Sequence, residues 1–97
     1  MEKLYQQLAD LARQHQAQRL VLFGSRARGD HHPRSDIDLA VYGMPPSQRS
    51  AFWLEADELP TLLKLDIVHV SPDMEAAFLK NIEKDGVILY AAENEKL

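Results

Sequence analysis

The chain has 97 residues, of which 45% are hydrophobic and 27% charged, and its formal net charge is −4. This size predicts one domain over residues 1–97, and the acidic balance argues against stable binding of duplex nucleic acid, which requires a basic surplus. No apolar run approaches the roughly 20 residues of a membrane span, the first residues lack a signal-peptide pattern and cysteine is absent, so we expect a cytoplasmic protein.

The first half of the chain predicts a helix followed by two strands. Leucines recur at helical spacing over residues 2–17, which indicates an amphipathic helix. The apolar run at residues 20–23 is typical of a buried strand, and Ser25 is placed to cap a short helical turn that reaches Arg28. From Asp36 to Val41 the residues alternate as in a strand with two different faces.

The second half of the chain predicts two further helices and two further strands. A Ser-Pro-Asp sequence begins at Ser71 and has the composition of a helix start, with serine at the cap and proline at the first position. The predicted elements are helices at 47–58 and 71–85, strands at 65–70 and 87–90, and a polar tail at 93–97. This alternation predicts an α/β (α+β) domain with a small sheet.

Gly24 and Ser25 lie between a predicted strand and a helical turn, and Asp36-Ile37-Asp38 follows after ten residues. Glycine lets the backbone approach a ligand closely, and donors at a helix start favour an anion. Arg26 and Arg28 could add positive charge. We therefore expect these four residues to bind the phosphates of ATP or another nucleoside triphosphate.

Two carboxylates, Asp36 and Asp38, occupy alternate positions of a predicted strand and so point to the same side, roughly 6.6 Å apart along the backbone. Such oxygen ligands suit one or two Mg²⁺ ions, and we expect two. Asp66 is the candidate third carboxylate, because it could lie beside Asp38 at the ~4.8 Å spacing of neighbouring strands. The expected reaction is nucleotidyl transfer, in which an acceptor hydroxyl attacks the α-phosphate and pyrophosphate leaves.

The segments GSRARGDHHPRSDIDLAV and LDIVHV resemble the minimal nucleotidyltransferase group of the DNA polymerase beta superfamily. The resemblance is greatest to small members that are encoded with HEPN-domain proteins in toxin–antitoxin pairs. It implies a nucleotidyltransferase fold, with a mixed sheet of about four strands flanked by helices. It also implies Mg²⁺ at Asp36, Asp38 and Asp66 and triphosphate at Gly24 and Ser25.

The leading functional hypothesis is an antitoxin that transfers AMP from ATP to a hydroxyl, expected to be a tyrosine, on a HEPN ribonuclease toxin. Asp66 would then also assist deprotonation of that hydroxyl. Two alternatives stay open: neutralisation of the partner by binding alone, and transfer to an RNA end or a small molecule. Because no acceptor-binding part is evident in the sequence, we expect a homo- or hetero-oligomer to complete the site.

Two further features have structural interpretations. Phe52, Trp53 and Leu54 are consecutive, and helix positions about 100° apart cannot all face one core. At least one of them should therefore lie near the surface, either as a partly covered aromatic or as a partner surface. His69 alternates with apolar neighbours and is interpreted as a packing residue with a satisfied hydrogen bond.

Overall fold

The computed structural model describes residues 1–93, so most of the predicted polar tail lies outside the described residues. A four-stranded mixed sheet forms the centre of the fold, in the order β3-β2-β1-β4. β1 pairs antiparallel with β2 and β4, and β2 pairs parallel with β3. The strands are β1 (Arg19–Phe23), β2 (Ile37–Tyr42), β3 (Leu65–His69) and β4 (Val87–Ala91).

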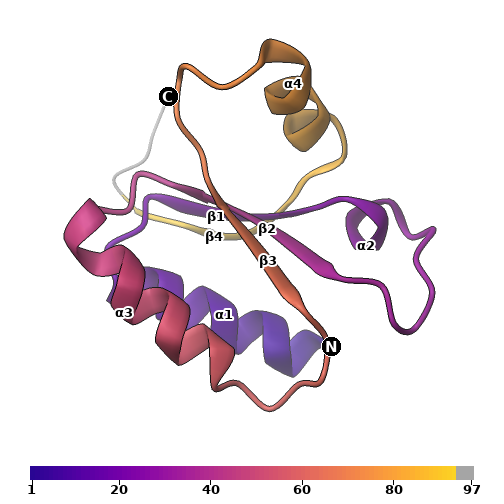
Figure 1. Cartoon of the computed structure of the whole chain (residues 1–97), viewed down its shortest axis with the longest axis horizontal. Coiled ribbons are helices and arrows are strands. Elements are labelled where there is room, and N and C mark those ends of the chain that lie inside the picture. The colour runs from indigo at the N-terminus through magenta and orange to yellow at the C-terminus, as the bar shows by residue number, and fades with distance from the viewer. Residues whose placement is uncertain (94–97) are drawn as a thin grey trace.

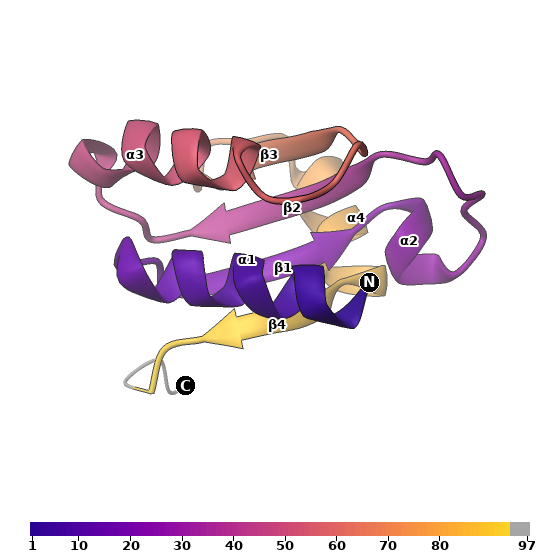
Figure 2. The ribbon, with the colours of Figure 1, turned by 90° about the horizontal axis from the view of Figure 1, so that it is seen from below.

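Helices cover both faces of this sheet. The helices are α1 (Glu2–Gln14), α2 (Ser25–Arg28), α3 (Pro46–Asp57) and α4 (Ala76–Asp85). In Figure 1, α1 and α3 lie side by side on one face, α4 lies on the other, and α2 is at one end. Figure 2 shows the same layers from the side of α1 and α3. None of the helices within residues 1–93 is long and apolar enough to cross a bilayer.

The side chains of β2 alternate between the two faces of the sheet, one of which carries the large core and the other a small cluster and Asp38. Ile37, Leu39 and Val41 are buried in the main hydrophobic cluster, against α1 and α3. Ala40 belongs instead to a small second cluster with Val21 and Ile82, below α4. Since side chains two apart share a face, Asp38 lies on the α4 face.

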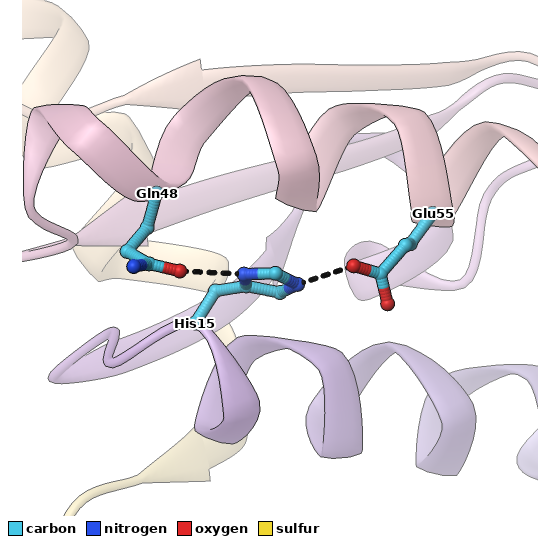
Figure 3. Close-up of polar contacts among 3 residues, drawn as sticks. All are labelled: His15, Gln48 and Glu55. Carbon is cyan, nitrogen blue, oxygen red and sulfur yellow. Dashed lines mark hydrogen bonds and ion pairs between the residues drawn. The ribbon is translucent and has the colours of Figure 1, made fainter.

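His15 joins the two helices of the main core layer (Figure 3). The ring is buried, with Nδ1 2.8 Å from Gln48 Oε1 and Nε2 2.8 Å from Glu55 Oε2. It also meets the Phe52 ring edge-on, at 6.1 Å between centroids. Helix α1 ends at Gln14, earlier than predicted, because Gln16 adopts a left-handed backbone with φ of 67°.

The predicted start of α3 is one residue late, and that of α4 is wrong. α3 begins at Pro46, with Pro45 as its cap, because a first position needs no N–H and tolerates proline. α4 begins at Ala76, with Glu75 as its cap, four residues later than predicted. The Ser71 hydroxyl hydrogen-bonds the Asp73 carboxylate, and a backbone bond from Met74 N to Ser71 O closes a turn there. The Ser-Pro-Asp sequence therefore forms a turn and not a helix cap.

Candidate active site

The phosphate turn is formed by Gly24 and Ser25, where β1 gives way to α2. Gly24 has φ of 77° and ψ of −158°, a conformation open essentially only to glycine. It occupies the cap position, so Ser25 is the first helical residue and not the predicted cap. The first backbone N–H groups of a helix have no partner inside the helix. The backbone N–H groups of Ser25 and Arg26 are therefore available at this end of α2.

Asp38 and Asp66 are directly paired in register on the parallel strands β2 and β3, as predicted. Neighbouring strands lie about 4.8 Å apart, so the two carboxylates share one edge of the α4 face. Asp36 is exposed and precedes β2, instead of lying on the strand as predicted. The Arg26 guanidinium donates to the carbonyl of Ser35, which keeps this segment as a loop up to Asp36.

The phosphate turn and the carboxylates touch each other at one point. A Cβ atom built on Gly24 would lie 2.2 Å from Asp38 Oδ2, which is far inside van der Waals contact. Only a hydrogen at this position lets the backbone of the turn approach the carboxylate. The donors of the turn and the oxygens of Asp38 therefore line one continuous surface, which a chain of phosphates could cross.

Negative charge is concentrated around Asp38. The pKa of Asp38 is raised, first by burial of the carboxylate and then by repulsion from Asp66 and Asp36, while Arg28 and Lys64 oppose this shift. Oxygen donors that repel one another are the ligand set expected for a hard divalent cation. Within residues 1–93, however, no three acidic or histidine side chains are close enough to hold a metal ion by themselves. The residues therefore fit Mg²⁺ if substrate oxygens complete its shell.

The two arginines after Ser25 differ in their contacts. Arg26 donates from Nε to the Ser35 carbonyl and from Nη2 to the Pro33 carbonyl, each at 3.0 Å, and so fastens the loop before Asp36. Arg28 donates to the Asp30 carboxylate at 3.0 Å, a hydrogen bond that raises the pKa of Arg28. Its charge still reaches Asp38. Phosphate binding by either arginine stays a prediction.

His69 departs from the sequence interpretation. Its Nδ1 atom is buried and has no hydrogen-bond partner among the described residues, so the predicted hydrogen bond is missing. Burial, followed by the charge of Arg49, lowers the pKa of His69. The residue lies three positions after Asp66 on β3 and so faces α3, away from the carboxylates.

A cavity of about 280 Å³ lies beside the phosphate turn, and no pattern in the sequence indicated it. We call it the α4 cavity, because α4 supplies three of its residues. It is lined by Phe23, Gly24, Arg28, Phe78, Asn81 and Asp85. The two sets of lining residues are far apart in the sequence, and the packing of α4 against β1 brings them together.

A comparison with protein families matches residues 6–95 to the family described as polymerase beta, nucleotidyltransferase. No curated protein matches the chain. Among solved structures, a toxin–antitoxin complex with AMP-PNP contains a chain of 23% identity and TM-score 0.70, with 94% of this chain and 76% of that chain covered.

Two further structures share the fold. A protein described as a nucleotidyltransferase from Sulfolobus solfataricus is 22% identical with TM-score 0.62, over 100% of this chain and 86% of that one. A complex of a tri-AMPylated Shewanella oneidensis HEPN toxin with an MNT antitoxin contains a chain of 20% identity and TM-score 0.65, with 98% of this chain and 76% of that chain covered. At these identities the structures support the nucleotidyltransferase fold.

Proposed function

Because the chain belongs to the polymerase beta nucleotidyltransferase family, we propose that it transfers AMP from ATP to a hydroxyl group of a partner protein. The observation that supports this most directly is the pairing of Asp38 with Asp66, in contact with the Gly24 turn. This arrangement offers anion donors and cation ligands side by side. A nucleoside triphosphate with divalent metal needs both.

The proposed roles follow from position. Gly24, by letting the backbone approach closely, and Ser25, through its donors, orient the β- and γ-phosphates at the start of α2. Asp36, Asp38 and Asp66 hold two Mg²⁺ ions together with phosphate oxygens. When bound, the ions would neutralise charge on the phosphates and assist both the entering and the leaving oxygen.

The reaction forms a bond between the acceptor oxygen and the α-phosphorus and breaks the bond from that phosphorus to the bridging oxygen of pyrophosphate. Asp66 is proposed to assist removal of the acceptor proton. It suits this role because it is exposed on the edge strand β3, where an acceptor can approach. Asp38 is more buried and is better placed to orient the nucleotide.

The proposed acceptor is a tyrosine of a HEPN ribonuclease toxin, and the chain would act as its antitoxin. Support comes from the similar structures: one is a toxin–antitoxin with AMP-PNP, and another contains a tri-AMPylated HEPN toxin with an MNT antitoxin. The partner would also supply the acceptor-binding side of the site, in a hetero-oligomer.

Labelled ATP provides the test. The protein and its co-purified partner are incubated with ATP labelled at the α-phosphate and, in parallel, at the γ-phosphate. Label on the partner from the α position alone is the expected result. Transfer from the γ position would mean that the protein is a kinase and would refute the proposal. The proposal is also refuted if no protein becomes labelled.

One observation favours a second candidate function, which is neutralisation by binding alone. Asp36 stands apart from the strand, and the carboxylates do not form a three-ligand metal group among the described residues. The double variant Asp36→Ala with Asp38→Ala separates the two functions. A protein that acts by binding should still neutralise its partner after both substitutions, whereas a transferase should lose both labelling and neutralisation.

A further inference from the structure

We propose that the α4 cavity holds the nucleobase of the nucleotide, and that Asn81 selects adenine there. This inference rests on the proposed function, because it assigns the base-binding part of the same site. Gly24 lines the cavity and is also the part of the phosphate turn that lies against Asp38. Arg28 lines the cavity as well, and its charge acts on Asp38. The cavity is therefore continuous with the surface assigned to the phosphates.

The size and the walls of the α4 cavity suit a planar base. Its volume of about 280 Å³ is just below the roughly 300–1,000 Å³ of whole-ligand pockets, which suits one part of a nucleotide. Phe23 at the end of β1 and Phe78 on α4 meet edge-to-face, with centroids 5.9 Å apart and planes at 88°. Their partly buried rings offer a fixed aromatic wall on which a base can stack.

The polar groups of the cavity favour a base with an amino group. The Asn81 side chain carries a donor and an acceptor side by side, which matches the amino group and adjacent ring nitrogen of adenine. The Asp85 carboxylate accepts hydrogen bonds only and again favours an amino group. Asn81 is exposed, so its amide is accessible to a ligand.

The sheet order separates this cavity from the acceptor. α4 packs over β1, whereas Asp66 is on β3, and β2 with Asp38 lies between them. An α-phosphate at Asp38 would thus have the nucleoside on its β1 side and the attacking hydroxyl on its β3 side. Both Asp85 and Asp38 interact with the charge of Arg28, which also lines the cavity, so one cation acts on the base cavity and on the carboxylates.

Binding measurements on the full chain test this assignment. With Mg²⁺ present, isothermal titration compares ATP, inosine triphosphate (in which a carbonyl oxygen replaces the amino group) and inorganic tripolyphosphate. We expect the wild type to bind ATP at least about tenfold more tightly than inosine triphosphate. Asn81→Ala should remove most of that difference, with the remainder due to Asp85, and leave tripolyphosphate binding unchanged. Lys80→Ala, an exposed neighbour on α4 that does not line the cavity, is the matched control.

A second variant tests the aromatic wall. Phe78→Leu keeps an apolar side chain over the small second cluster but removes the ring, and it should weaken ATP binding about tenfold with tripolyphosphate unaffected. Circular dichroism and thermal unfolding verify that each variant is folded.

The outcomes separate the two proposals. Equal wild-type binding of ATP and inosine triphosphate, or discrimination that is undiminished in Asn81→Ala, overturns the base assignment while triphosphate binding stands. If neither ATP nor tripolyphosphate binds, the proposed function fails and the base assignment fails with it.

Discussion

Replacing Gly24 by alanine should damage catalysis more than stability. The new Cβ would lie 2.2 Å from Asp38 Oδ2, whereas ordinary contact begins near 3.4 Å. The carboxylate must then retreat by about 1 Å, a displacement that can cost on the order of 100-fold in rate. The glycine-only backbone at this position adds roughly 1–3 kcal/mol of strain to the folded state.

Gly29→Ala is the matched control for this experiment. Gly29 also has positive φ, at 85°, but nothing lies within 4 Å of a Cβ built there. Its substitution should cost about 1–2 kcal/mol through the left-handed backbone and leave transfer intact. Urea unfolding measures stability, and label transfer from α-labelled ATP measures the rate. Equal activity of the two variants would refute the role of the contact between Gly24 and Asp38.

Four other experiments test separate parts of the structure. In metal-free buffer Asp38→Asn should raise the unfolding temperature at pH 7, because burial and neighbouring carboxylates raise the pKa of Asp38 and so disfavour its ionised form in the folded state. The stability that Asp38 contributes is fully present below its ordinary pKa of 3.8 and is lost as the pH rises through the raised pKa. An equal gain in unfolding temperature at pH 3 would contradict this explanation. Phe52→Ala, at a fully buried side chain, should cost about 3–5 kcal/mol in urea unfolding. Trp53→Glu, at a side chain that is 51% exposed, should cost under about 1 kcal/mol in the same assay but weaken partner binding in a pull-down. If Trp53→Glu mainly unfolds the protein, the partner-surface interpretation is lost. Arg26→Ala should lower transfer and leave the loop before Asp36 open to limited proteolysis, since two carbonyl contacts are lost; an unchanged cleavage pattern would argue against the loop role. His15→Ala should cost about 2 kcal/mol in the same unfolding assay, because two contacts to α3 disappear, with no effect on transfer.

Much of the site was predictable because it depends on short-range patterns. The alternation in β2 fixes which face Asp38 occupies, and the next strand brings Asp66 into register with it. The position of Asp36 was not predictable in this way. Alternation alone continues the strand back to this residue, but the Arg26 contacts hold the preceding backbone as a loop.

Helix boundaries were less predictable, since the same residues serve caps and turns. The Ser71 hydroxyl has two possible partners, a helix N–H or a nearby carboxylate, and the fold uses the Asp73 carboxylate. The α4 cavity left no sequence signal at all. Phe23 and Phe78 meet only after α4 has packed across β1, and helical spacing cannot indicate which strand it will cross.

The division of the sheet into two unlike faces explains how so small a chain can hold three neighbouring carboxylates. Among the described residues, twelve buried side chains form the main cluster on the α1 and α3 side, but only three form the cluster under α4. α4 packs over β1, which leaves the β2 and β3 ends open for Asp38 and Asp66. Repulsion among the carboxylates is thereby offset by hydrophobic burial on the opposite face. Substitutions in the main cluster should therefore change stability without altering the chemistry, and Gly24 is a position where a substitution should change both.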